Sequence, residues 1–227
     1  MKPVSDAPSA LSQACEDRDF VDWHQGLPWC AVWVVLVPAP DVAQRVAVAR
    51  AALNGSLLPR YARQPHITLA YRGLMDVPAG HAAAQFDVDD LQADIARLQA
   101  SALAPFTVQI AGSDSFTTVP YLPVQSASPL HALHDALALA APYPGWQYVP
   151  HITVGHYADA QRLDGLRQRM ASAVNHLPAL QVPVTAVHLV RYRTHDIAGA
   201  LYVEGVFDLP TRRYYCASDA LWPQIAQ

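Results

Sequence analysis

The chain has 227 residues, of which 52% are hydrophobic and 15% are charged. This composition supplies enough apolar side chains for a sizeable core and excludes global disorder. The net charge of −4 argues against a protein that coats long nucleic acid, because such proteins neutralise many phosphates with basic side chains. The cysteines, Cys15, Cys30 and Cys216, form no Cys-x-x-Cys pair, so neither a zinc ribbon nor a dithiol redox site is indicated.

The pattern along the chain predicts a cytoplasmic protein made of one domain with two flanking segments. The first residues lack the apolar core of a signal peptide, and the longest apolar run, 31–37, is too short to cross a bilayer. We expect a flexible or peripherally packed polar extension over 1–26, the domain over 27–210, and an irregular tail over 211–227. We also expect a monomer with no membrane partner.

Strand-like and helical segments alternate within this domain. Residues with β propensity, bounded by proline and polar residues, predict strands over 29–37, 66–71, 106–111, 119–125, 151–154, 182–193 and 200–209. Apolar residues at helical spacing predict helices that begin near Asp41, Asp87, Ser128 and Asp159. This interleaving is typical of an α/β or an α+β domain, and the pattern alone leaves both classes open.

The tetrapeptide Pro-His-Ile-Thr occurs twice, within the segments 64–71 and 149–157. Each copy continues with an aliphatic residue and then a small one, and a tyrosine lies shortly beyond. Each also lies in a β-rich segment and is followed at a distance by a predicted helix. The shared context indicates two duplicated halves.

Alternate side chains of a strand point to opposite faces, so His66 shares a face with Thr68, and His151 shares one with Thr153. If a pseudo-two-fold axis relates the halves, two imidazoles and two hydroxyls meet in one place. A neutral imidazole can then accept a proton from the attacking water or hydroxyl, while an imidazolium donates one to the leaving oxygen. The hydroxyls can donate to the non-bridging phosphate oxygens. A single His-x-Thr on a strand is usually structural, whereas two matched copies favour a catalytic pair acting on a phosphodiester.

These paired His-aliphatic-Thr-aliphatic motifs resemble the 2H phosphoesterase superfamily, and most of all the bacterial RNA 2′,3′-cyclic phosphodiesterase (2′-5′ RNA ligase) family. The resemblance extends over 27–209 and includes the closing segment Gly-Ala-Leu-Tyr-Val at 199–203. It implies a bilobal α+β fold in which two antiparallel sheets flank a central cleft, with helices outside. It also implies that the protein needs no metal and no cofactor.

The same resemblance implies roles for the motif residues. His66 and His151 form the catalytic pair, His66 as the acid toward the leaving O3′ and His151 as the base toward water. Thr68 and Thr153 bind the phosphate. The implied reaction opens a 2′,3′-cyclic phosphate at an RNA end to a 2′-phosphate.

The chain departs from the family pattern after the second motif, where RNA-processing members often carry arginine and this chain carries His156. A cationic phosphate contact is then missing or weakened at neutral pH. Arg72, Arg191 and Arg193 are the candidates to replace it. The aromatic residues that could stack on a base are Tyr71, Tyr121, Trp146 and Tyr157.

Other functions stay open at this stage. The same residues suit a 2′-5′ oligoadenylate, an ADP-ribose cyclic phosphate or a cyclic nucleotide, and the acidic N-terminal extension favours a small nucleotide over long RNA. A non-catalytic RNA-binding module would not require a matched acid and base. His131 and His134, three residues apart on a predicted helix beside Asp135, suggest a metal site, but no convincing third ligand accompanies them. No Gly-x-Ser-x-Gly and no phosphate-loop or dinucleotide-binding glycine pattern occurs.

Overall fold

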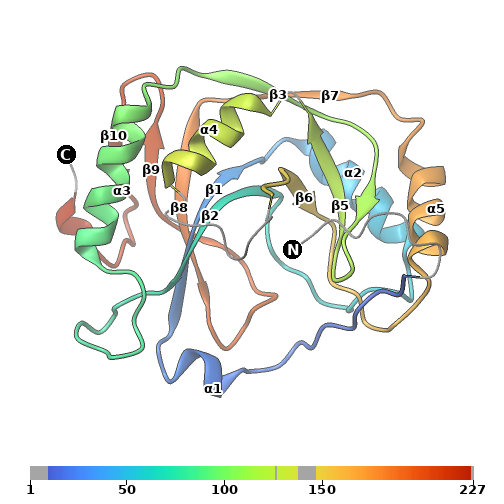
Figure 1. Ribbon diagram of the computed structural model, residues 1–227, viewed down its shortest axis with the longest axis horizontal. Coiled ribbons are helices and arrows are strands. Elements are labelled where there is room, and N and C mark those ends of the chain that lie inside the picture. The colour runs from blue at the N-terminus through green and yellow to red at the C-terminus, as the bar shows by residue number, and fades with distance from the viewer. Residues whose placement is uncertain (1–9, 126, 138–146, 226–227) are drawn as a thin grey trace.

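The computed structural model describes residues 10–125, 127–137 and 147–225. Its centre is a ten-stranded sheet in the order β10-β9-β8-β1-β2-β6-β5-β3-β7, with β4 paired to β5 (Figure 1). Every strand pair in this sheet is antiparallel. The strands β2 and β6, which carry the two Pro-His-Ile-Thr motifs, are neighbours in the middle of the sheet.

The strands are β1 (Trp29–Leu36), β2 (His66–Leu74), β3 (Phe106–Ile110), β4 (Asp114–Ser115), β5 (Pro120–Gln125), β6 (His151–Thr153), β7 (Leu180–Val184), β8 (Ala186–Arg193), β9 (Tyr202–Asp208) and β10 (Arg213–Cys216). The helices are α1 (Val21–His24), α2 (Pro40–Ala52), α3 (Val88–Ser101), α4 (Ser128–Leu137) and α5 (Leu163–Val174), and a 3-10 turn covers Pro223–Ile225.

The two faces of the sheet have different neighbours. The four longer helices contribute apolar side chains to one large core, and α2 packs beside α5 while α3 packs beside α4 (Figure 1). The opposite face carries a smaller apolar cluster, which includes Cys30, Val32 and Val34 of β1 and Val190 and Tyr192 of β8. We call this side, which carries the smaller cluster and none of the four longer helices, the open face of the sheet. β1 is almost fully buried because both of its faces are covered, which explains its nearly continuous apolar sequence.

The predicted α+β class is confirmed, and the antiparallel sheet has its helices outside, as expected. The two halves of the sheet are joined through a single β2–β6 register pair, Ile67 with Ile152. The segment predicted as one strand over 182–193 is two strands, β7 and β8, which pair with different halves. The sequence pattern does not show this because Thr185 between them breaks neither the apolar alternation nor the β propensity.

Helix starts agree with the sequence in part. Asp87 caps α3 in a capping box with Asp90, as its position predicts. Asp41 does not cap α2, because Pro40 already occupies the first turn and the cap residue is Ala39. The helix expected from Asp159 begins only at Leu163.

Both flanking segments contain ordered elements in their described parts. Residues 10–26, which we call the N-terminal strap, run along the edge of the molecule and end in α1 (Figure 1). The expectation of an irregular tail is wrong for 213–225, because β10 extends the sheet beside β9 and Trp222 and Ile225 enter the large core. Among the helices of the described ranges, none combines the length and the hydrophobicity that crossing a bilayer would need.

Candidate active site

The two motif strands face each other around a local two-fold relation. β2 and β6 are antiparallel, and Ile67 lies opposite Ile152. If the antiparallel register is extended by one residue in each direction, His66 lies opposite Thr153 and Thr68 lies opposite His151. Diagonal positions in such a pair are about 7–8 Å apart, which is the spacing that this register gives the two histidines. The sheet thus brings both imidazoles and both hydroxyls together on the open face.

Each histidine ring is held by the same local contact. The Nδ1–H of His66 donates to the carbonyl of Gln64 at 2.7 Å, and that of His151 donates to the carbonyl of Val149 at 2.6 Å. A carbonyl only accepts, so the neutral ring carries its proton on Nδ1 and leaves Nε2 as the basic nitrogen. The proline between each pair has no N–H to donate, and its own carbonyl continues the ladder to the neighbouring strand. The Pro-His dipeptide therefore fixes the tautomer in both halves.

The two rings have different surroundings. His66 is 8% exposed, and burial together with the nearby charges of Arg63 and His151 lowers its pKa to about 4. His151 is half-buried, with its ring 5.1 Å from Phe116 and 5.2 Å from Tyr121, and burial lowers its pKa as well. Since a charge on one ring disfavours a charge on the other, the pair accepts one proton more readily than two.

A β-bulge after the first motif changes the direction of the next side chains. In the β1–β2 register, Thr68 pairs with Val34, and the next pair is Ala70 with Trp33, so Leu69 is the extra residue. Strict alternation from Thr68 would send Tyr71 into the core. Instead Tyr71 is 54% exposed and lies on the open face.

The bulge is stabilised by side chains from outside β2. The Tyr148 hydroxyl donates to the Thr68 carbonyl at 2.8 Å, and His134 Nδ1 donates to the Leu69 carbonyl at 2.6 Å. The rings of His134 and Tyr148 stack with their centroids 4.2 Å apart. His134, a candidate metal ligand by its spacing from His131, is thus a buried structural group. The described residues contain no group of three or more His, Cys, Asp or Glu arranged to hold a metal ion.

The three arginines proposed to bind phosphate do not lie on the open face. Arg72 donates from Nε and Nη2 to Asp94 at 2.7 and 2.5 Å, beneath α3. Arg191 is 4% exposed and pairs with Glu204 and Asp219. Arg193 lies over the ring of Trp29. The bulge turns Arg72 toward the core side of β2. Arg191 and Arg193 lie on the side of β8 that faces the core. The expectation that these arginines bind the phosphate is therefore wrong.

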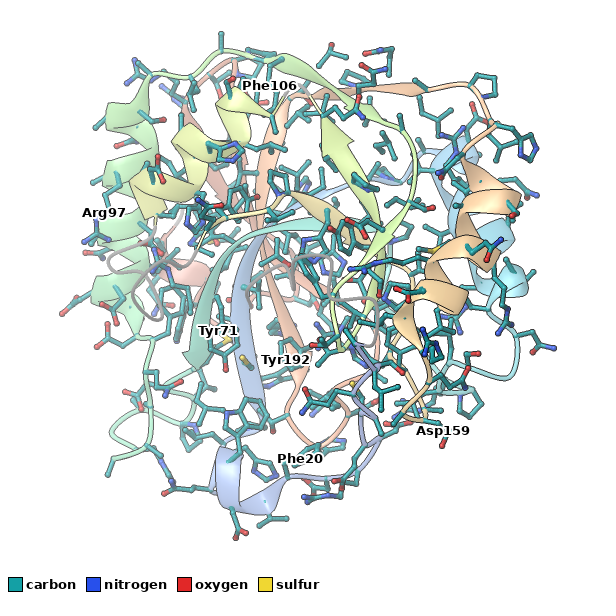
Figure 2. All side chains as sticks on the ribbon, turned by 45° about the vertical axis from the view of Figure 1, so that its right-hand side comes forward. Phe20, Tyr71, Arg97, Phe106, Asp159 and Tyr192 are labelled. Atoms are coloured by element: carbon teal, nitrogen blue, oxygen red, sulfur yellow. The ribbon has the colours of Figure 1, made fainter. Side chains whose placement is uncertain are left out.

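Of the aromatic candidates, two lie on the open face. Tyr121 pairs in register with Thr153, and its ring stacks on Phe116 at 4.4 Å. Tyr71 lies beside Tyr192, and both are labelled in Figure 2. Tyr157 is fully buried and its hydroxyl is hydrogen-bonded to Ser115, so it is a core residue. Trp146 lies outside the described residues.

His156 lies close to the site but does not supply the missing cation. Burial and the charge of Arg63 lower its pKa to about 4, so it is neutral at pH 7. Its ring meets that of Tyr61 edge-on at 5.1 Å, and Tyr61 in turn lies near the Thr153 side chain. His156 therefore acts as a neutral neighbour of the second motif.

Arg63 and Tyr192 also border the site, although neither was a candidate from the sequence. Arg63 precedes His66 by three positions, and its guanidinium lies 4.2 Å from the ring centroid of Tyr192. The sequence offered one signal for Arg63, namely its place just ahead of the first motif. Tyr192 lies on β8 between Arg191 and Arg193, so alternation puts it on the opposite face, and the strand pairing shows that this is the open face.

An antiparallel α+β fold with paired His-x-Thr strands at its centre defines a 2H phosphoesterase. The family model for the 2′-5′ RNA ligase superfamily matches residues 38–196, a segment that includes both motifs, and the chain belongs to this family. No curated protein matches the sequence.

Several solved structures are similar to this one. Escherichia coli LigT complexed with 3′-AMP is 16% identical with a TM-score of 0.45, over 78% of this chain and 94% of that one. LigT complexed with NADP+ is 17% identical with a TM-score of 0.42, over 72% and 87%. A structure described as a phosphoesterase is 15% identical with a TM-score of 0.42, over 72% and 88%.

Proposed function

We propose that this protein is a metal-independent phosphodiesterase that opens the 2′,3′-cyclic phosphate of a ribonucleotide, as found at the end of a cleaved RNA, to a 2′-phosphate. The observation that carries this proposal is the local two-fold relation of β2 and β6, which pairs two identically oriented imidazoles with two hydroxyls. Membership of a phosphoesterase superfamily supports the reaction class.

In the proposed reaction, water attacks phosphorus and the P–O3′ bond breaks. One imidazole Nε2 takes the proton of the water, and the other gives a proton to O3′. Thr68 and Thr153 donate to the non-bridging oxygens, where negative charge accumulates. Because Nδ1 of each ring is already bonded to a carbonyl, only Nε2 is available for proton transfer.

Burial favours one assignment of roles. His66 is the more deeply buried ring and has the more strongly lowered pKa, so it is the harder of the two to protonate. This supports His66 as the base and His151 as the acid, the reverse of the order that the family resemblance implied.

Incubation in EDTA with a short RNA that ends in a 2′,3′-cyclic phosphate tests the proposal. We expect ring opening to a 2′-phosphate, resolved from the 3′-phosphate by chromatography, at a rate that EDTA does not change. A rate that disappears with EDTA and returns with a divalent cation would contradict the mechanism. No turnover of any 2′,3′-cyclic phosphate would contradict the substrate.

The N-terminal strap supports a short substrate. Hydrogen bonds anchor the strap. The Cys15 N–H donates to the Tyr157 carbonyl of the second half at 2.8 Å. The carboxylate of Asp17 accepts hydrogen bonds from Arg60. The strap then crosses to the first half, where Trp23 packs against the apolar cluster of the open face. Its acidic side chains outnumber its single arginine, and it lies outside the segment that the family model matches.

We therefore expect a 2′,3′-cyclic mononucleotide to be turned over at least about tenfold more efficiently than a 20-nucleotide RNA with the same end, because like charges repel within a Debye length of about 10 Å. The ratio of the two kcat/KM values measures this preference. Replacing the exposed Asp22 and Glu16 by their amides should reduce the ratio, and raising the salt concentration should do the same. Equal turnover of both substrates at low salt would remove the role of the strap.

A further inference from the structure

Arg63 lies in a segment that is fixed to the loop after β8. The Ala62 N–H donates to the Ala198 carbonyl at 2.7 Å, and Arg63 Nη2 donates to the Ile197 carbonyl at 2.6 Å. Gln64 completes this attachment through its side-chain amide, which exchanges hydrogen bonds of 2.9 Å in both directions with the backbone of Leu201. The guanidinium therefore has a defined position ahead of His66.

This guanidinium has little to neutralise it. In the described part of the chain, Arg63 forms no ion pair with an acidic side chain. Its Nε is buried without a hydrogen-bond partner. Among the described residues, the groups that contact this guanidinium are the Ile197 carbonyl and the ring face of Tyr192. The guanidinium therefore keeps donors that no acidic side chain occupies, and an anion on this face could accept from them.

The position of Arg63 relates it to both motifs. Its charge acts on His66 of the first motif, on His156 just after the second, and on Tyr61, which lies near Thr153. Arg72, Arg191 and Arg193 lie on the core side, and His156 is neutral at pH 7. Arg50 also lies beside the second motif, where its Nη1 donates to the Val154 carbonyl at 2.8 Å. Arg63 differs from it because its charge also acts on His66 of the first motif.

We propose that Arg63 binds the phosphate of the substrate and supplies the positive charge that family members often obtain from an arginine after the second motif. The planar fork of its guanidinium suits two non-bridging phosphate oxygens, and Tyr192 holds the plane of the fork from one side. Nη1 forms no hydrogen bond to a described residue and is not buried, so it is the donor that a phosphate oxygen can reach. This proposal rests on the proposed function, since it assigns the anion site of the same reaction centre.

The test compares Arg63→Met with Arg60→Met. Arg60 lies on the same segment, but its guanidinium is tied to Asp17 and Asp196 at the surface. We expect Arg63→Met to reduce kcat/KM for a 2′,3′-cyclic mononucleotide by about 10²-fold, as loss of one preorganised transition-state donor does. The inhibition constant of inorganic phosphate should rise about tenfold or more. Arg60→Met should stay within about twofold in both measurements, because the strap that Arg60 anchors is expected to act against long RNA and not on a mononucleotide or inorganic phosphate.

A pH profile separates a role in charge from a role in structure. Arg63 lowers the pKa of His66, so its removal raises that pKa. The neutral form of His66 is then lost at a higher pH, and the acidic limb of kcat/KM should move upward in Arg63→Met but not in Arg63→Lys. Arg63→Lys keeps the charge and loses the fork, so we expect an intermediate rate.

The outcomes distinguish this proposal from the function on which it rests. If the wild type turns over cyclic phosphates and Arg63→Met matches Arg60→Met, Arg63 is not the anion site. If the wild type turns over none of them but binds inorganic phosphate in a manner that depends on Arg63, the anion site stands and the proposed function fails. If Arg63→Met does not fold, the comparison of Arg63→Lys with Arg60→Lys decides, and equal inhibition by phosphate in both overturns the proposal.

Discussion

Replacing His66 or His151 by alanine is expected to lower kcat/KM for a 2′,3′-cyclic mononucleotide by a factor of about 10² to 10⁴, the usual contribution of a general acid or base. Each ring is fixed by one Nδ1 contact and exposes its Nε2 to the reaction, so no neighbouring group replaces it. Steady-state kinetics on the two variants measures the loss. The double variant should lose less than the product of the two single factors, because the two rings act as one unit.

A substrate with a good leaving group then separates the two roles. A p-nitrophenyl phosphodiester releases a phenolate that needs no proton, so loss of the acid matters little and loss of the base still matters. With His151 as the acid, His151→Ala should recover most of its activity on this substrate, while His66→Ala should not. The opposite pattern would restore the order that the family resemblance implied.

The control for this pair is His195→Ala, since His195 is exposed and lies outside both motifs. It should leave kcat/KM unchanged. If either single motif variant retains activity within about threefold of the wild type, an acid–base role for that histidine is excluded.

The centre of the site follows from the sequence because the repeated motif needs only strand alternation to be placed. His66 with Thr68, and His151 with Thr153, lie on one face for this reason, and the apolar residues between them enter the core. The helix starting after Asp87 and the buried strand at Trp29–Leu36 were predictable from a cap and an apolar run in the same way.

The surroundings of the site were not predictable, because they depend on features that leave no mark in the local pattern. The bulge at Leu69 reverses the faces of Tyr71 and Arg72, and it exists because Tyr148 and His134, far along the chain, bind the carbonyls there. The position of Arg63 is set by hydrogen bonds to the loop at 197–201, which is equally distant in sequence. Long-range hydrogen bonds of this kind decide which side chains lie beside the two motifs.

The substitution expected to cost the most stability is Asp94→Ala, on the core side of β2. Asp94 is 1% exposed and accepts hydrogen bonds from Trp33 Nε1, from Arg72 and from Arg97. Its removal leaves the buried guanidinium of Arg72 without a counter-charge, which costs about 3–5 kcal/mol. Since a domain is stabilised by only about 5–15 kcal/mol, denaturant unfolding should show a large shift of the midpoint.

Two variants show which part of this network matters. Arg97 is 37% exposed, so Arg97→Ala should cost at most about 1 kcal/mol. The double variant Asp94→Leu with Arg72→Met removes both charges, so no unpaired charge stays buried. It should recover most of the stability that Asp94→Ala loses. A cost of about 1–3 kcal/mol remains, because the Trp33 N–H loses its acceptor. If the double variant is no more stable than Asp94→Ala, the loss comes from packing under α3. If it recovers, the loss comes from the unpaired charge of Arg72, and the ion pair with Asp94 is what makes a buried arginine tolerable on the core side of the sheet.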